Sequence, residues 1–192
     1  MERLLRAAAS VSGASAVVDS SKLPSHGLVL ASLPGVELHA LHLVRDSRAV
    51  AHSWRRKKLR RRVNGRAEYL PRLSPARSVQ RYYSGNLPMH ALAARLPPGR
   101  FTRLRYEDFT AAPRQTVQRI LRRLDHPMDE AAFLSDSRVS LGDNHLVDGN
   151  PMRHRHGEVE IRQDRGWETS MPPAERALVH AATLPLRLLY GY

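Results

Sequence analysis

Hydrophobic and polar positions alternate along the chain in patterns that predict helices and strands in turn. Residues 2–11 carry apolar side chains at helical spacing and lead to Gly13, which predicts a helix that stops there. Residues 14–21 hold the run Ala-Val-Val before polar residues, which predicts a short buried strand. Residues 36–44 follow a Pro-Gly turn and predict a second strand, which ends directly before Arg45.

The alternation continues through the middle of the chain. A helix capped by Ser47 is expected to run through residues 48–58, a third strand over residues 101–106, and an amphipathic helix over residues 112–124. Strands that alternate with helices favour a parallel sheet with helical crossovers, and ligands of such sheets bind beyond the carboxyl ends of the strands. The expected fold class is therefore α/β.

Two long segments show little regular pattern. Residues 54–78 contain ten Lys or Arg residues and predict a mobile basic loop, either a lid that binds an anion or the acceptor, or a solvated surface segment. Residues 140–167 are rich in Gly, Asn and His and predict a long ordered loop, a kind of segment that is often functional. A chain of 192 residues suits one core of ordinary size, so residues 1–192 are expected to form a single domain.

Composition narrows the possible partners and compartments. The chain has 31 Lys and Arg residues against 18 Asp and Glu, which favours an anionic partner: nucleic acid, an acidic membrane face or a highly phosphorylated small molecule. It has no cysteine, which excludes disulfides, thiolate zinc sites and a cysteine nucleophile. No window approaches the roughly 18 apolar residues of a membrane span, and a secretory signal is not recognisable, so a cytoplasmic protein is expected.

Arg45 and Ser53 are the first candidate site. Arg45 follows a strand, and Ser53 lies about two turns into the next helix, so both can face the crevice beyond the strand. A guanidinium and a hydroxyl supply the charge-assisted donors that a terminal phosphate needs. Alternatively, Arg45 pairs with Asp46 or Asp108, and Ser53 bonds back to a helical carbonyl.

The segment Leu41–Trp54 resembles the 3′-phosphate-binding segment of the sulfotransferases that use 3′-phosphoadenosine 5′-phosphosulfate, PAPS. In that family a strand ends in Arg followed by Asp or Asn, and a helical Ser lies eight residues after the Arg, as Arg45 and Ser53 do here. Three further segments agree in their order along the chain: Val17–Pro24, Leu104–Leu124 and Gly149–Trp167. The resemblance covers roughly residues 16–192.

The resemblance implies a P-loop NTPase-like core of three layers, α/β/α, around a short parallel sheet. It also implies transfer of a sulfuryl group from PAPS to a hydroxyl or amine of a small molecule or carbohydrate, without a metal; nucleic acid is not the expected partner. By the same resemblance, Arg45 and Ser53 hold the 3′-phosphate. Arg153 and Arg155 close over that phosphate and the adenosine, and Gly149 lets the backbone approach the ligand.

Two other positions follow from the resemblance. Lys22 lies near the place where cytosolic members carry their catalytic base, and it is the candidate catalytic residue, able to stabilise charge on the transferring or leaving group. It can equally be an exposed strand-end lysine beside Asp19. For Tyr106–Asp108 a structural role is favoured, since carboxylates at the start of a helix accept backbone amides; Glu107 as general base is the lesser alternative.

One family feature is missing from the sequence. The family begins with a strand and a Gly- and Ser/Thr-rich loop that cradles the 5′-phosphosulfate, whereas residues 8–16 offer one glycine and no basic side chain. The first βα unit is therefore expected to be absent, through a shortened chain or a start codon assigned downstream of the true one. Two alternatives to an active enzyme follow: a remnant that binds adenosine 3′,5′-bisphosphate, and a basic protein whose residues 55–66 bind polyanions or nucleic acid.

Overall fold

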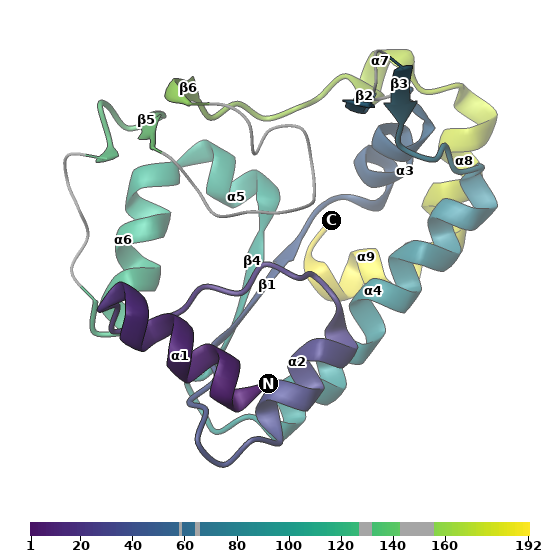
Figure 1. The fold of residues 1–192 in the computed structure, drawn as a ribbon. Helices are drawn as coiled ribbons and strands as arrows, with labels where there is room; N and C mark the ends of the chain where they lie inside the picture. The colour runs from purple at the N-terminus through teal and green to yellow at the C-terminus, as the bar shows by residue number, and fades with distance from the viewer. Residues whose placement is uncertain (58, 64–65, 127–131, 143–155) are drawn as a thin grey trace. The chain divides into compact units, whose positions relative to one another are not determined.

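The structure, a computed structural model, describes residues 1–57, 59–63, 66–126, 132–142 and 156–192. Its helices, drawn in Figure 1, are α1 (Glu2–Ser12), α2 (Pro24–Ala31), α3 (Ser47–Arg55), α4 (Pro75–Arg95), α5 (Tyr106–Ala111), α6 (Pro113–Arg123), α7 (Trp167–Ser170), α8 (Pro173–Ala182) and α9 (Leu184–Tyr190). Its strands are β1 (Ala40–Val44), β2 (Leu59–Val63), β3 (Arg66–Tyr69), β4 (Phe101–Arg105), β5 (Arg138–Leu141) and β6 (Gly157–Glu160). Within the described residues, β1 pairs with β4, β2 with β3, and β5 with β6.

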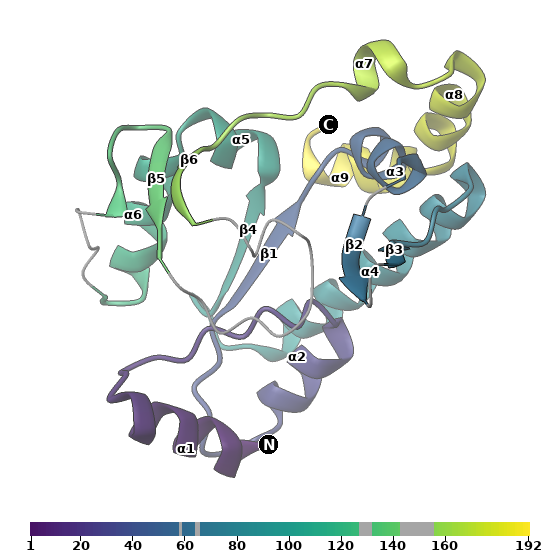
Figure 2. The ribbon, with the colours of Figure 1, turned by 45° about the horizontal axis from the view of Figure 1, so that its top comes forward.

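The sheet of β1 and β4 confirms the predicted α/β class. The two strands lie side by side and run in the same direction (Figure 1, Figure 2). Each leads directly into a helix, β1 into α3 and β4 into α5, so the carboxyl ends of both strands open onto helix starts. Side chains alternate along β1: His42 and Val44 are buried, whereas Leu41 and Leu43 are exposed.

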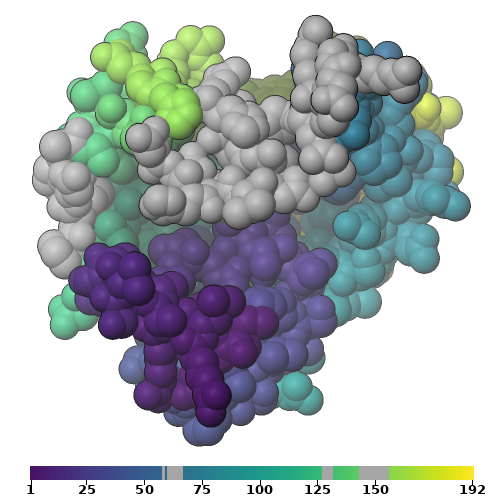
Figure 3. Space-filling view, in the orientation of Figure 1, coloured from purple at the N-terminus to yellow at the C-terminus, as the bar shows by residue number. Residues whose placement is uncertain are grey.

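The chain divides into two compact units. Unit 1 comprises Met1–His42 and Tyr83–Arg103, and unit 2 comprises Leu43–Tyr82 and Leu104–Tyr192. In unit 1, α1 confirms the first predicted helix. It ends at Gly13, whose φ of 64° is left-handed and therefore favours glycine. No residue of α1 is buried, and Figure 3 shows this helix at the surface.

The prediction of a strand over residues 14–21 is wrong, because these residues form neither a helix nor a strand. Val17 and Val18, expected in a core, are exposed. The carboxylate of Asp19 accepts the backbone amide of Ser21 at 2.7 Å, which is a local turn that competes with an extended run. Short apolar runs are therefore ambiguous until a pairing partner is known.

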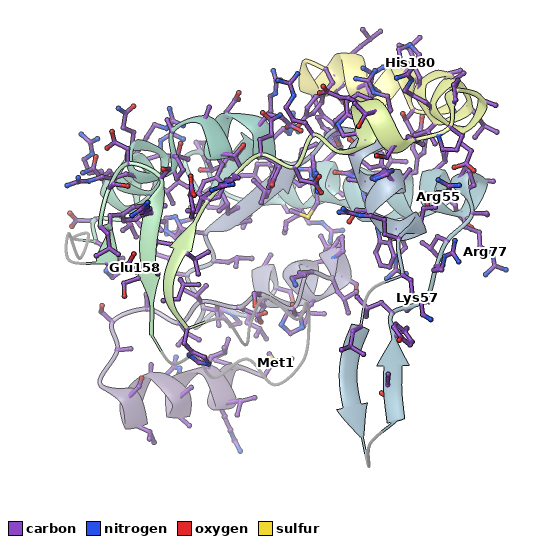
Figure 4. All side chains as sticks on the ribbon, turned by 90° about the horizontal axis from the view of Figure 1, so that it is seen from above. Met1, Arg55, Lys57, Arg77, Glu158 and His180 are labelled. Carbon is purple, nitrogen blue, oxygen red and sulfur yellow. The ribbon has the colours of Figure 1, made fainter. Side chains whose placement is uncertain are left out.

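The predicted basic loop over residues 54–78 is also partly wrong, because α3 continues to Arg55 and α4 begins at Pro75. Between them β2 and β3 form an antiparallel hairpin. The side chain of Lys57 lies 4.0 Å from the centre of the Tyr69 ring at the open end of this hairpin, where Figure 4 labels Lys57. The run of like charges along β2 hides the two-residue period by which a strand is recognised.

The C-terminal part of unit 2 holds an apolar core. Ala51 of α3 packs with Met171 and with Val179 of α8, and Val79 and Trp167 cover this cluster. The late segment, residues 140–167, is not all loop: β5 and β6 pair antiparallel, with Leu141 opposite Gly157. Residues 143–155 lie outside the described residues.

A buried hydroxyl pair joins the start of α3 to the start of α9. Ser47 Oγ and Thr183 Oγ1 lie 2.7 Å apart, and Thr183 also donates to the carbonyl oxygen of Val179 at 2.7 Å. Both hydroxyl-bearing residues are almost fully buried.

Thr183→Val is expected to lower the free energy of unfolding by about 1–3 kcal/mol, because the Ser47 hydroxyl is left in the interior without this partner. Urea denaturation of Thr183→Val, Ser47→Ala and the double variant measures this. In the Ser47→Ala background the same substitution should cost less, since no orphaned hydroxyl remains. Equal costs in both backgrounds would contradict the coupling.

Candidate functional site

Arg45 lies directly after β1, and its guanidinium is held in one orientation. Its Nη2 donates to the backbone carbonyl oxygen of Asp164 at 2.8 Å and lies 3.4 Å from the carboxylate of the same residue. The guanidinium carbon lies 4.5 Å from the centre of the Tyr106 ring, a cation–π contact. The side chain is only 20% exposed. Arg45 therefore lies in an ion pair, as the alternative expected, but its partner is Asp164 and not Asp46 or Asp108.

The Nε of Arg45 is buried and has no hydrogen-bond partner within the described structure. Buried donors are almost always bonded, so an unbonded guanidinium nitrogen is unusual. Its position at the carboxyl end of β1 is where ligands of parallel sheets bind. Arg45 thus combines a fixed orientation with a buried donor that no group in the described segments accepts.

The carboxylate of Asp46 does not pair with Arg45, because it already interacts with two other arginines. It is the N-cap of α3: its Oδ1 accepts the backbone amide of Arg48 at 2.8 Å and the Arg48 Nε at 3.0 Å, and its Oδ2 accepts Arg48 Nη2 at 2.6 Å. The buried Arg187 lies 4.0 Å away. Burial favours protonation of Asp46, but the hydrogen bonds of Arg48 and the charges of both arginines outweigh it and lower the pKa.

Three side chains fix the peptide groups around Arg45. The hydroxyl of Tyr82 donates to the carbonyl oxygen of Arg45 at 3.2 Å, and the carboxylate of Glu107 accepts the amide of Asp46 at 3.4 Å. The hydroxyl of Tyr192 lies 3.0 Å from the carbonyl oxygen of Val44 and contacts Glu107. Burial raises the pKa of both tyrosines, so both hydroxyls keep their protons at neutral pH. Glu107 thus makes the structural contacts predicted for Tyr106–Asp108.

The other predicted residues divide between the two units. Ser53 lies in α3 of unit 2, partly buried, on the helix that follows Arg45. Lys22 lies in unit 1, in the exposed turn before α2, with a left-handed φ of 65°. The predicted phosphate-covering residues Gly149, Arg153 and Arg155 lie outside the described residues.

His52 is a functional candidate that sequence patterns do not indicate. It lies on α3 next to Ser53 and is 6% exposed, and its Nδ1 is buried without a hydrogen-bond partner in the described part of the chain. Burial lowers the pKa of His52, and the charges of Arg56, Arg55 and Arg45 lower it further, while that of Asp164 raises it. The imidazole is therefore neutral at pH 7 and lies among the charges around Arg45.

A hollow lies on the surface of α6. It has a volume of about 600 Å³ and is open to solvent; its lining residues all come from α6: Gln115, Gln118, Arg119, Arg122 and Arg123. Over the described ranges, no group of three His, Cys, Asp or Glu side chains is arranged to hold a metal ion. None of the described helices has the length and apolarity needed to cross a membrane.

A family model described as the sulfotransferase family matches residues 4–130, which are about two thirds of the chain. The matched residues include β1, α3 and β4. This chain belongs to the sulfotransferase family. Among solved structures it is similar to a sulfotransferase domain from the curacin biosynthetic pathway, with 17% sequence identity and a TM-score of 0.42. The match covers 73% of this chain and 51% of that domain, so this sulfotransferase chain spans about half the length of the solved one. No curated protein matches.

Asp164, Tyr82 and Tyr192 are parts of the site that sequence reasoning missed. Tyr82 is 37 residues from Arg45, Asp164 is 119 residues away, and Tyr192 lies 148 residues from Val44. No local spacing links residues so far apart. The one available signal was the order of segments in the family resemblance, which includes residues 149–167 but not the role of Asp164.

Proposed function

We propose that this sulfotransferase binds PAPS and transfers its sulfuryl group to a hydroxyl or amine of a small-molecule or carbohydrate acceptor. The observation that carries the proposal is Arg45: a guanidinium at the end of a parallel strand, fixed by Asp164 and Tyr106, with a buried Nε that has no hydrogen-bond partner among the residues that the structure describes. Membership of the family supports the reaction class.

In the proposed reaction, Arg45 and Ser53 hold the 3′-phosphate of the donor. The acceptor oxygen or nitrogen attacks sulfur while the bond from sulfur to the 5′-phosphate oxygen breaks, so adenosine 3′,5′-bisphosphate leaves and the acceptor proton passes to a base or to water. Positioning and charge stabilisation carry such transfers. Lys22 is proposed to stabilise the developing charge, and Gly149, Arg153 and Arg155 to cover the nucleotide.

The binding step is tested by calorimetry with adenosine 3′,5′-bisphosphate and adenosine 5′-phosphate. The bisphosphate is expected to bind about 100-fold more tightly, because the 3′-phosphate adds charge-assisted hydrogen bonds to Arg45. Equal affinities would contradict the proposal, as would salt-dependent binding to duplex DNA that the nucleotide does not displace.

The transfer step is tested with ³⁵S-labelled PAPS over a panel of alcohols, phenols, amines and sugars. Label that appears in an acceptor, with release of the bisphosphate, supports the enzyme. Preferential binding of the bisphosphate without transfer to any acceptor would instead support a nucleotide-binding remnant.

A further inference from the structure

The carboxylate of Asp164 joins Arg45 to a second arginine. Arg56 Nη2 donates to Asp164 Oδ2 at 2.8 Å, and Arg45 Nη2 lies 3.4 Å from the same oxygen. The other carboxylate oxygen accepts the backbone amide of Gly166 at 3.1 Å, which fixes the carboxylate between the two guanidiniums. One side chain therefore brings together cations that are eleven positions apart in the sequence.

This cluster has more positive than negative charge. Burial raises the pKa of Asp164, but the Gly166 amide and the charges of Arg56 and Arg45 outweigh it and lower the pKa, so the carboxylate is ionised. One negative charge against two guanidiniums leaves a surplus cation. His52 adds, beside the same charges, a buried Nδ1 that has no hydrogen-bond partner within the described ranges. An incoming phosphate would supply the missing negative charge.

We propose that Arg56 is a second cation for the 3′-phosphate and that Asp164 is a positioning residue for both arginines. The inference rests on the proposed function, since it assigns two further residues to the same nucleotide site. A shared carboxylate that already holds two long side chains reduces the conformational entropy that they lose when the phosphate binds. Arg56 also directly follows α3, where the negative end of the helix dipole favours a cation.

Arg55 provides a matched control for Arg56. It is the adjacent residue, of the same type and similar exposure: the side chains are 40% exposed for Arg55 and 46% for Arg56. Its partner differs, because Arg55 Nε lies 3.3 Å from a carboxylate oxygen of Glu175 in α8. Figure 4 labels Arg55 at the end of α3. Loss of either arginine removes one positive charge and one surface ion pair, and only Arg56 is tied to Arg45.

The test is calorimetry of adenosine 3′,5′-bisphosphate and adenosine 5′-phosphate with the full chain and with Arg56→Gln, Arg55→Gln and Asp164→Asn. The ratio of the two dissociation constants reports on the 3′-phosphate alone. Arg56→Gln is expected to lower this preference about five- to tenfold, since it removes a charge-assisted contact. Asp164→Asn keeps the side-chain size and should also lower the preference, because two unneutralised guanidiniums repel each other.

Several results would overturn the inference. If Arg56→Gln and Arg55→Gln lower the preference for the bisphosphate equally, the effect comes from the net positive charge of the region and not from a contact of Arg56. A higher preference in Asp164→Asn would mean that the carboxylate competes with the phosphate instead of positioning the arginines. The melting temperature of each variant identifies any general loss of structure. Such a loss would weaken the binding of both nucleotides and leave the ratio of their dissociation constants unchanged.

Failure of the inference and failure of the proposed function give different results. If the wild-type chain shows no preference for the bisphosphate, both the proposed function and the proposed role of Arg56 are refuted. If the wild type shows the preference and Arg45→Gln abolishes it while Arg56→Gln does not change it, only the role of Arg56 is refuted.

Discussion

Arg45→Gln is expected to weaken the binding of adenosine 3′,5′-bisphosphate about 100-fold, which corresponds to about 2.7 kcal/mol. The substitution removes the guanidinium, including the buried Nε that lacks a hydrogen-bond partner in the described part of the chain, but keeps a polar side chain of moderate length. Adenosine 5′-phosphate has no 3′-phosphate, so its affinity should change less than about threefold. Calorimetry of both nucleotides measures the effect.

Arg45→Lys separates charge from geometry at this position. The ammonium group keeps the positive charge but has neither the planar fork that matches a phosphate nor the extended face that stacks on Tyr106. We expect an affinity for the bisphosphate about tenfold below wild type, between the wild type and Arg45→Gln. An Arg45→Gln variant that binds the bisphosphate like the wild type would refute the assignment of Arg45 to the phosphate.

Asp46→Ala is expected to lower the free energy of unfolding by about 3–5 kcal/mol, because it leaves two cations without their buried carboxylate. The Asp46 side chain is 7% exposed, bonds to Arg48 through both oxygens, and lies 4.0 Å from the buried Arg187. The substitution also removes the N-cap of α3, which contributes about 1 kcal/mol. Urea denaturation at neutral pH measures the loss.

Measuring the stability of Asp46→Asn as a function of pH separates the contribution of the Asp46 charge from that of its N-cap hydrogen bond. Asparagine still caps α3, so this variant should lose less stability than Asp46→Ala. The folded-state pKa of Asp46 lies below its ordinary value of 3.8, so its stabilisation is present above that value and is lost as the pH falls through the folded-state pKa. The difference in stability between wild type and Asp46→Asn should therefore shrink on acidification below about pH 4. A difference that is constant with pH would contradict the role of the charge.

Local periodicity was sufficient to predict the helices and strands that pack through one face or that end at a helix- or strand-breaking residue. The helix that stops at Gly13, the strand before Arg45 and the amphipathic helix α6 were predicted because apolar spacing and a breaker residue are local properties. The stretch around Val17 and Val18 failed for the opposite reason. An apolar run becomes a strand only if a neighbouring strand pairs with it, and no described strand pairs with these residues.

For the candidate site, the sequence by itself was enough to propose the two groups that lie close together along the chain. Arg45 and Ser53 are eight residues apart across a strand end and one helix, so their chemistry and their family resemblance can be read directly from the spacing. The tertiary structure alone decided what holds the guanidinium: Asp164, at 2.8 Å through its carbonyl oxygen, comes from 119 residues further along the chain. Ion pairs between distant residues depend on how the elements pack, and a sequence with 31 basic and 18 acidic side chains allows many pairings. Packing selects one of them, and that selection gave Asp46 to Arg48 and Asp164 to Arg45 and Arg56.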